Sequence, residues 1–297
     1  MTDRLAMQDP RDQYPQPPFP RQPQPVPGLA RKMDPVPDHG ETSYTGSGKL
    51  VGRKALVTGG DSGIGRAAAI AFAREGADVA ISYLPSEAAD AAEVIQLIEA
   101  EGRKAIDLPG DITDEAWCSA MVEKARAGLG RLDVLVINAG HQQSREDISQ
   151  VTSQDFDETM KTNLYALHWI AQAAVPYLPA GASVITTASV QAYEPSAILL
   201  DYATTKAGIV AYTKALAKQL IEKGIRANVV APGPFWTALQ SSGGQPQEAV
   251  QKFGEKSAFG RPGQPVEIAP IYVMLASQEA SYITGEIYGV TGGAGIA

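Results

Sequence analysis

Hydrophobic and polar positions along residues 49–297 alternate between short apolar runs and longer segments with the period of an amphipathic helix. The apolar runs predict seven strands, at residues 54–59, 78–83, 104–108, 133–138, 183–188, 226–231 and 286–290. The intervening periodicity predicts helices at 64–75, 86–100, 115–127, 156–178, 201–222 and 265–276. Strands that are apolar on both faces are typical of a parallel sheet covered on both sides. The pattern therefore predicts one α/β domain, a doubly wound, seven-stranded parallel sheet.

Residues 1–48 depart from this pattern, because ten of the 21 prolines lie there. Proline lacks a backbone N–H and has a fixed φ, so this Pro/Gln-rich segment is predicted to be an extended N-terminal arm. A solvated tail and an arm packed on its own domain or on a neighbouring subunit both remain open. Tyr14, Phe19 and Leu29 favour the packed arm, since solvated tails contain few aromatic side chains. The predicted organisation is an arm at 1–48 followed by a domain at 49–297.

Composition and charge narrow the classes of function. Hydrophobic residues at 44% and charged residues at 20% are typical of a globular protein. A net charge of −8 without a basic stripe disfavours nucleic-acid partners. No apolar run reaches the roughly 18 residues of a membrane span, and the N-terminal MTDRLAMQDPRDQ lacks the apolar region of a secretory signal. The single Cys118 suits a reducing compartment, so a cytoplasmic protein is predicted.

The first strand leads into TGGDSGIG at residues 58–65. Gly59, Gly63 and Gly65 allow a close turn, and a helix is predicted to begin near Ile64, so backbone N–H groups and the positive helix end face one point. A pyrophosphate fits there. A plain glycine-rich turn is the alternative, but the position between a first strand and an Ala-rich helix favours a dinucleotide. No G-K-[ST] follows, which excludes a P-loop.

The residues after the second strand normally distinguish NAD from NADP. An acid there binds the ribose hydroxyls of NAD, and an Arg binds the 2′-phosphate of NADP. Here the chain reads Ser82-Tyr83-Leu84-Pro85, which has neither. NAD(H) and NADP(H) both remain open. NADP(H) is slightly favoured, because no acid at this position repels a phosphate that Ser82, Tyr83 or Arg66 would contact.

Four residues have side chains suited to carbonyl chemistry. Tyr202 and Lys206 are four residues apart, on one face of a predicted helix, and a neighbouring ammonium lowers the pKa of a phenol toward that of a general acid or base. Tyr212 has no such Lys and is interpreted as a packing residue. Ser189 follows a strand at the ligand-binding edge of the sheet, where a turn cap is the alternative. Asn163 lies in an apolar helix, where it needs a partner, and a structural hydrogen bond is equally open.

Several segments, in this order, resemble the short-chain dehydrogenase/reductase family over residues 49–297: TGGDSGIG at 58–65, Asp111 in GDITD, NAG at 138–140, Asn163, Ser189, Tyr-x-x-x-Lys at 202–206 and PGPFWT at 232–237. With its Pro-rich extension the chain also resembles bacterial general-stress or glucose-dehydrogenase-like oxidoreductases and NADP-dependent aldehyde reductases. The resemblance implies a Rossmann fold, a homotetramer, and metal-free hydride transfer between NAD(P)(H) and a small carbonyl or alcohol substrate.

The resemblance also implies roles for individual residues. Tyr202 exchanges a proton with the substrate oxygen, Lys206 lowers the pKa of Tyr202 and binds the nicotinamide ribose, and Ser189 orients the carbonyl. Asn163 holds a water that links Lys206 to solvent. The implied cofactor-binding residues are Gly59, Asp61, Ser62, Gly63, Ile64, Gly65, Tyr83, Leu84, Asp111, Ile112, Asn138, Ala139, Gly140, Tyr202, Lys206, Pro232, Gly233 and Thr237. No metal site is expected, since His39, His141 and His168 lack metal-ligand spacing.

The substrate is expected over Ser189 and Tyr202, beneath a lid at about residues 234–260. Plausible walls are His141, Gln191, Phe235 and Trp236. This mixed apolar and amide lining suggests a small aldehyde, ketone or sugar-like alcohol.

Two other readings of the chain are weighed. A dinucleotide-binding scaffold or redox sensor without turnover, which assembles through the arm, is the alternative to an enzyme. A sugar-nucleotide epimerase is disfavoured, because it would need a longer substrate domain. For the arm itself, the sequence-based prediction is that it crosses a subunit boundary.

Overall fold

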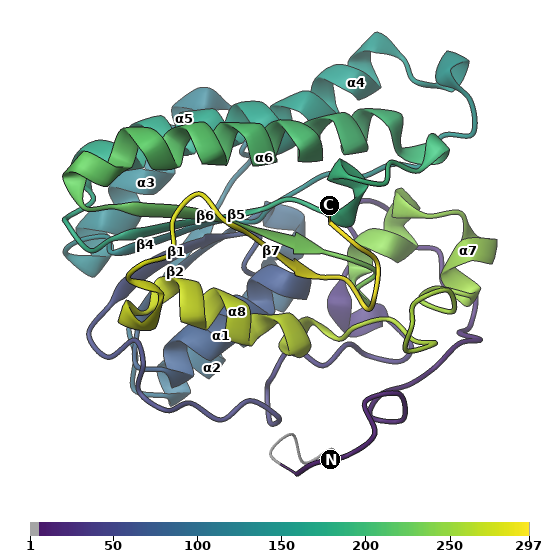
Figure 1. Ribbon diagram of the computed structural model, residues 1–297, viewed down its shortest axis with the longest axis horizontal. Helices are drawn as coiled ribbons and strands as arrows, with labels where there is room; N and C mark the ends of the chain where they lie inside the picture. Colours follow the sequence, from purple (N-terminus) through teal and green to yellow (C-terminus); the bar gives the residue numbers. More distant parts are fainter. Residues whose placement is uncertain (1–5, 297) are drawn as a thin grey trace.

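The computed structural model describes residues 6–296. They form a seven-stranded parallel sheet between two layers of helices, with the N-terminal arm packed outside (Figure 1). The strands are β1 (Lys54–Thr58), β2 (Asp78–Tyr83), β3 (Ala105–Pro109), β4 (Val134–Ile137), β5 (Ser183–Thr187), β6 (Arg226–Pro232) and β7 (Ile287–Val290). Their order is β3-β2-β1-β4-β5-β6-β7, so the sheet grows outward from β1 in one direction and from β4 in the other. The predicted doubly wound fold is confirmed, and the switch point between β1 and β4 is where such folds bind ligands.

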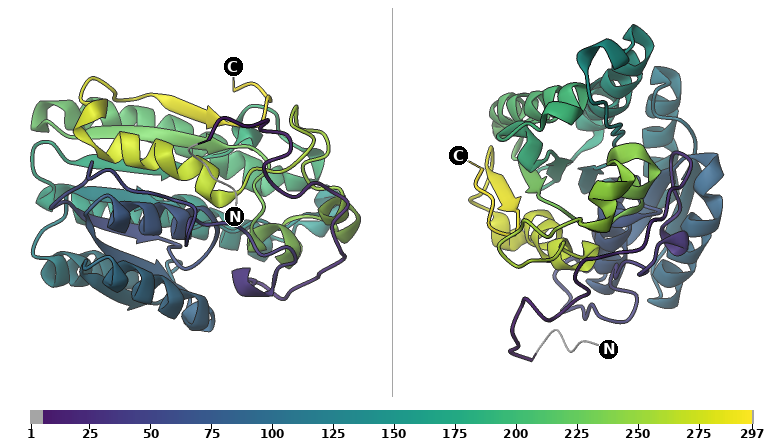
Figure 2. Two further views of the ribbon diagram at one scale, coloured as in Figure 1. Left: turned by 90° about the horizontal axis from the view of Figure 1, so that it is seen from below. Right: turned by 90° about the vertical axis from the view of Figure 1, so that its right-hand side faces the viewer.

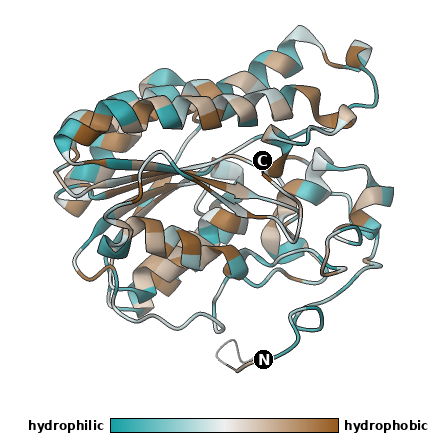
Figure 3. Cartoon of the chain, in the orientation of Figure 1, coloured by the Kyte–Doolittle hydropathy of each residue, from teal (hydrophilic) through white to brown (hydrophobic). Residues whose placement is uncertain are grey.

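Three helices cover each face of the sheet. On one face lie α1 (Gly63–Arg74), α2 (Ala88–Ala100) and α8 (Pro265–Ala276), and on the other α3 (Glu115–Leu129), α5 (Ala166–Ala174) and α6 (Leu200–Leu220). Figure 3 shows the strands between them as largely hydrophobic, as expected for a sheet buried on both faces. No helix within residues 6–296 combines the length and the apolar character needed to cross a lipid bilayer.

Shorter elements connect these layers. Two short helices, α4 (Ser153–Met160) and α7 (Gln247–Gln251), and two π turns, Lys161–Tyr165 and Gln240–Gly244, lie outside the sheet layers. The 3₁₀ turns are Ala30–Lys32, Pro85–Glu87, Ile148–Gln150, Val175–Tyr177, Val190–Ala192, Ala197–Leu199, Ile221–Lys223 and Gln278–Ala280.

The predicted strand bounds differ from the structure by at most one residue at either end, but the helix predicted at 156–178 does not run as one regular helix. It starts earlier, at Ser153, because Thr152 and Asp155 form a reciprocal capping box there. The π turn at Lys161–Tyr165 then separates α4 from α5. Single π turns inside helices are frequent at functional sites. This one contains Asn163.

The arm packs on its own domain, as Figure 2 shows. The Phe19 and Trp236 ring centres are 4.2 Å apart, and the indole N–H of Trp236 donates a 2.8 Å hydrogen bond to the carbonyl oxygen of Pro35. Phe19 and Met33 are buried in a cluster with Trp236 and Val250. Packing of the arm on its own domain, one of the arrangements left open by the sequence, is therefore present, and its crossing of a subunit boundary stays a prediction. Residues 1–5 of the predicted arm lie outside the described residues.

Candidate active site

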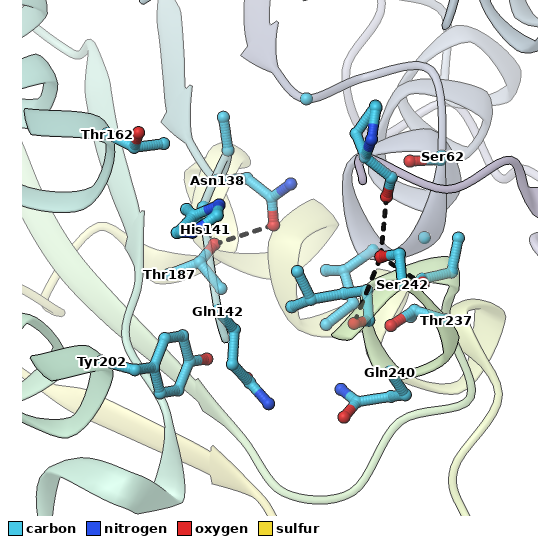
Figure 4. Close-up of a pocket in the computed structure, with 18 of the residues that line it drawn as sticks. Ser62, Asn138, His141, Gln142, Thr162, Thr187, Tyr202, Thr237, Gln240 and Ser242 are labelled. Atoms are coloured by element: carbon cyan, nitrogen blue, oxygen red, sulfur yellow. Dashed lines mark hydrogen bonds between the residues drawn. The ribbon is translucent and has the colours of Figure 1, made fainter. Parts of the chain in front are cut away.

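A cavity of about 390 Å³ opens at the carboxyl ends of the central strands, and Figure 4 shows part of its lining. Most of the residues predicted to bind the cofactor line it: Gly59, Asp61, Ser62, Gly63, Ile64, Tyr83, Leu84, Asp111, Ile112, Asn138, Ala139, Gly140, Tyr202, Lys206, Pro232, Gly233 and Thr237. Gly65 lies behind this surface. The cavity spans the switch point of the sheet, where the fold was expected to hold a dinucleotide.

The glycine turn has the geometry of an anion cradle. Gly63 has a φ of +52°, which side chains other than hydrogen rarely allow. A Cβ on Gly65 would lie 1.9 Å from the carbonyl oxygen of Gly59, so the absence of a side chain lets α1 start against the end of β1. Ser62 precedes α1 without capping it through its side chain, and Ser62, Gly63 and Ile64 all line the cavity. The uncapped helix end therefore fits the pyrophosphate of a dinucleotide.

Two carboxyl groups lie where the adenosine ribose is expected, beside Ser82, Tyr83 and Leu84. Asp61 is 2% exposed, and its Oδ2 has no hydrogen-bond partner among the described residues. Glu87 Oε2 accepts a 3.1 Å hydrogen bond from the Leu84 N–H. Burial raises the pKa of both groups, and the charges of Asp61 and Asp90 raise that of Glu87 further. The two carboxyls also interact with each other, beside the position expected for the ribose.

The sequence reasoning named Asp61 but missed Glu87. The available signal was its position in the 3₁₀ turn Pro85–Glu87, which starts with proline and ends with an acid that binds the preceding Leu84 N–H. Glu87 lies beyond the end of β2 at Tyr83, past the position that usually carries the acid.

The groups proposed to contact a 2′-phosphate are engaged elsewhere. Arg66 is buried, with its guanidinium 3.0 Å from the carboxylate of Glu41 and 3.0 Å from that of Glu93. Tyr83 lines the cavity, but its hydroxyl donates to Asp107 on β3. Arg66 does not line the cavity, so its predicted contact with the phosphate is corrected, whereas Ser82 and Tyr83 do line it and their contact with a phosphate stays a prediction. Glu41 and Glu93 pair with the Arg66 guanidinium, and Asp107 accepts from the Tyr83 hydroxyl.

Tyr202 and Lys206 lie one turn apart on α6, facing the cavity. The Lys206 Nζ is 5.3 Å from the centre of the Tyr202 ring and donates a 2.9 Å hydrogen bond to the carbonyl oxygen of Thr187 at the end of β5. The Ser189 Oγ accepts a 3.1 Å hydrogen bond from the Gln191 N–H and also interacts with the Tyr202 hydroxyl. The three side chains therefore form one cluster, from helix α6 and the loop after β5.

Burial dominates the proton affinities in this cluster. It raises the pKa of Tyr202 to about 12, opposed by the hydrogen bond to Ser189, and it lowers the pKa of Lys206 to about 8. Desolvation of the phenolate is the larger effect on Tyr202 here, and the predicted lowering of its pKa by Lys206 stays a prediction. The raised pKa keeps the Tyr202 phenol protonated at neutral pH.

Asn163 is buried behind the cavity surface rather than in its lining. Its Oδ1 accepts a 2.7 Å hydrogen bond from the His141 N–H, and its Nδ2 donates to the His141 carbonyl at 2.9 Å and to the Thr205 hydroxyl at 3.0 Å. The structural hydrogen bond left open by the sequence is thus present. Asn163 fixes the loop after β4 against α6, and a water-holding role stays a prediction.

The predicted substrate walls separate into two groups. Ser189, Gln191, His141 and Phe235 line the cavity. Trp236 does not, and this prediction is corrected: its side chain is fully buried against Phe19 on the far side of the segment. Consecutive side chains in an extended segment point in opposite directions, so Phe235 and Trp236 cannot both face the substrate.

The predicted lid is attached to the domain by two glutamines that the sequence reasoning missed. Gln142 Nε2 donates a 2.6 Å hydrogen bond to the Gly244 carbonyl, and Gln143 Nε2 donates a 3.2 Å bond to the Ser242 carbonyl. Further lining residues that were missed are Val26, Pro27, Thr162, Gln240 and Ser242. Polar side chains in a loop carry no periodic signal, so only the folded chain reveals which face the cavity.

Known proteins similar to this chain over most of its length are named as oxidoreductases or reductases. A family model described as Enoyl-(Acyl carrier protein) reductase matches residues 59–295. The chain is 58% identical over 287 residues to the Escherichia coli (strain K12) protein named Uncharacterized oxidoreductase YghA, covering 97% of this chain and 98% of that protein. It is 40% identical to NADPH-dependent aldehyde reductase 1, chloroplastic, of Arabidopsis thaliana, covering 90% of this chain and 95% of that protein.

Two further similarities are informative. The chain is 39% identical to Glucose and ribitol dehydrogenase of Daucus carota, covering 93% of this chain and 96% of that protein. A solved short chain dehydrogenase from Burkholderia cenocepacia J2315, in complex with NADP, matches the fold with a TM-score of 0.77 and 33% identity. That match covers 83% of this chain and 99% of the other.

Proposed function

The chain belongs to the short-chain dehydrogenase/reductase family, and from that premise we propose that it transfers a hydride between NAD(P)(H) and a small aldehyde, ketone or sugar-like alcohol. Membership makes it an NAD(P)-dependent oxidoreductase. The observation that carries the finer proposal is the cluster of Ser189, Tyr202 and Lys206 in the same cavity as the glycine turn.

The cofactor is NAD(P)(H), and we favour NADP(H). The Arabidopsis relative is named as NADPH-dependent, and the similar Burkholderia structure is a complex with NADP. The turn at Gly59–Gly65 would hold the pyrophosphate, and Asp61 and Glu87 would lie beside the adenosine ribose. A 2′-phosphate requires at least one of these two carboxyls to be protonated, and the burial that raises their pKa values supplies that state.

A bound nicotinamide would supply the hydride to the substrate carbon or accept it from there. The protein's side chains would donate a proton to the substrate oxygen or remove it. In reduction, the Tyr202 hydroxyl would give its proton to the substrate oxygen. The Ser189 hydroxyl would hold that oxygen beside Tyr202, and the Lys206 ammonium would stabilise the phenolate left behind. A solvent proton then restores Tyr202, by the route for which we propose Asn163 as a water-holding residue.

The lining next to Ser189 supports a small, partly polar substrate. His141, Gln191 and Phe235 combine an imidazole, an amide and an apolar ring. The Gln191 amide oxygen already accepts a 2.7 Å hydrogen bond from the Ser196 N–H, which leaves its NH₂ group as a donor for a substrate hydroxyl. Relatives named as an aldehyde reductase and as a glucose and ribitol dehydrogenase support the same class.

We also propose a cytoplasmic homotetramer. The lone cysteine, Cys118, is buried and suits a reducing compartment, and the family resemblance supports the tetramer. Analytical ultracentrifugation of the full chain tests the oligomeric state, and a monomer would overturn it.

The experiment that tests the function combines cofactor binding with turnover. The purified chain is titrated with NADH and NADPH by fluorescence and then assayed with a panel of aldehydes, ketones and sugars. Oxidation of the reduced cofactor with formation of an alcohol product supports the proposal. Tight cofactor binding with silence across the whole panel would instead favour a dinucleotide-binding scaffold or redox sensor.

A further inference from the structure

Residues 22–34 of the arm form a closed loop, here called the strap. At its base, Gln22 Nε2 donates to the Asp34 carbonyl at 2.7 Å, and the Asp34 N–H donates to Gln22 Oε1 at 3.0 Å. Inside it, the Leu29 N–H donates to Gln24 Oε1 at 2.9 Å. Proline has little backbone freedom to lose, and the strap contains three in residues 23–27. The strap is therefore a preformed element rather than a loose tail.

One side of the strap is tied to the predicted lid. The Gln24 N–H donates to the Ser241 carbonyl at 3.1 Å, and the Ser242 hydroxyl lies 2.9 Å from both the Pro27 and the Ala238 carbonyl oxygens, which share its single proton. Gly28 has a φ of +85°, and a Cβ there would lie 3.0 Å from the Ser242 Cβ and 3.1 Å from the Ala238 carbonyl oxygen. The strap and the π turn Gln240–Gly244 are in close contact, at a point where a Cβ would be crowded and the positive φ disfavours a side chain.

The other side of the strap is tied to the start of α2. The Ala30 N–H donates a 2.7 Å hydrogen bond to Asp90 Oδ2, and the Arg31 guanidinium lies 3.6 Å from Asp90 Oδ1. The Asp90 side chain is fully buried, and its charge acts on Glu87 at the ribose end of the cavity. A hydrogen bond to a buried carboxylate is among the stronger ones in proteins. The strap thus joins two elements that flank the cavity.

Between these two ties the strap reaches the cavity itself. Val26 and Pro27 line it, together with Ser62 and Thr237 on the same side. Figure 4 shows Ser242 close to Ser62 and Thr237, across the cavity from Tyr202, and Figure 2 shows the arm passing beside the segment that contains α7. The glycine turn, the lid and the strap are therefore contiguous around one groove.

We propose that the strap is a part of the cofactor site: Val26 and Pro27 close the rim of the groove, and the ties to Ser242 and Asp90 hold them over the bound dinucleotide. The inference rests on the proposed function. Its consequence is that loosening the strap weakens cofactor binding and speeds release, with kcat at saturating cofactor unchanged, because the Tyr202 cluster lies on the opposite side of the cavity.

The test uses Gly28→Ala, which pushes the strap away from Ser242 without altering a side chain that lines the cavity. Gly52→Ala is the matched control, because Gly52 has a similar φ of +77° with nothing within 4 Å of its added Cβ. Both variants are made in the full chain, and their folding is checked by circular dichroism. NADPH fluorescence gives the dissociation constant, and stopped-flow displacement gives the release rate. We expect both to rise about tenfold in Gly28→Ala, as for the loss of one or two hydrogen bonds, and to stay near the wild-type values in Gly52→Ala.

Ser242→Ala is the second variant: it removes the contact with Pro27 with less risk to folding, and because Ser242 also lines the cavity its result is interpreted together with that of Gly28→Ala. An increase in the NADPH dissociation constant of about threefold is expected for one hydrogen bond. Unchanged binding and release in both Gly28→Ala and Ser242→Ala would overturn the strap while leaving the proposed function intact. An unaltered chain that binds neither NADH nor NADPH would overturn the proposed function and the strap together.

Discussion

The ammonium of Lys206 lies 5.3 Å from the centre of the Tyr202 ring, one helical turn away on α6. The same ammonium donates to the carbonyl oxygen of Thr187, the last residue of β5, at 2.9 Å. Lys206 therefore joins α6 to the carboxyl end of β5, beside the Tyr202 side chain that faces the cavity. This arrangement holds a buried cation next to a buried acid, and the first two predictions rest on it.

Replacing Tyr202 with Phe removes the proposed proton donor with little change in shape. We expect kcat for carbonyl reduction to fall about 100- to 10,000-fold, the usual worth of general acid catalysis, with the NADPH dissociation constant nearly unchanged. Tyr212→Phe on the same helix is the control, because the Tyr212 hydroxyl contacts His168 and does not line the cavity. Normal turnover by Tyr202→Phe would remove Tyr202 from its role.

The buried Lys206 should give the reaction a pH dependence. Burial lowers its pKa to about 8, so the ammonium is present below that pH and is lost as the pH rises through it. We expect kcat/KM for reduction to decline above about pH 8, because the phenolate of Tyr202 then has no adjacent cation. Lys206→Arg keeps its charge at every accessible pH, so its residual activity should lack this decline. A decline retained unchanged in Lys206→Arg would assign it to another group.

Glu87 should influence the choice between NADP(H) and NAD(H). Its raised pKa means that the carboxyl is protonated at the lower end of the working range and becomes charged as the pH rises. The negative charge then opposes the 2′-phosphate, so the affinity for NADPH relative to NADH should fall about tenfold between pH 6 and pH 9.

Glu87→Gln should reduce this change in cofactor preference, since an amide does not titrate and only Asp61 and the 2′-phosphate itself then still do. Titrations with both cofactors at several pH values measure it. Glu99→Gln, at an exposed acid on α2, the helix that follows Glu87, is the control and should behave as the unaltered chain does. Equal pH dependence in the two variants would show that Glu87 does not sense the phosphate.

Phe19 should anchor the arm thermodynamically. It is 4% exposed and stacks on Trp236, so Phe19→Ala leaves an apolar gap and should lower the free energy of unfolding by about 3 kcal/mol. Urea denaturation measures the loss. Tyr282→Ala changes a fully exposed ring, and its effect should be below about 0.5 kcal/mol. Deletion of residues 1–46 should destabilise the domain as well, and a truncated protein of unchanged stability would contradict the packing of the arm.

Much of the fold and the candidate site could be predicted from the sequence, because the signals are local. The period of apolar residues placed the strands within one residue, and four-residue spacing put Tyr202 and Lys206 on one helical face. The glycines of the turn mark positions where a side chain would clash with the backbone or demand an unfavourable φ. These requirements are met within one turn or one strand, so they can be seen without the rest of the chain.

Only the tertiary structure decided which partner each polar or aromatic side chain selects. Arg66 belongs to Glu41 and Glu93 rather than to a phosphate, and Trp236 packs on Phe19 rather than on substrate. These contacts join residues that are distant in the sequence, and their free energy depends on burial and competing partners that no local pattern encodes. The amino-acid sequence by itself determined a dinucleotide fold with a Tyr-Lys helix. Only the folded chain shows that Val26 and Pro27 of the proline-rich arm line the cavity of the candidate active site.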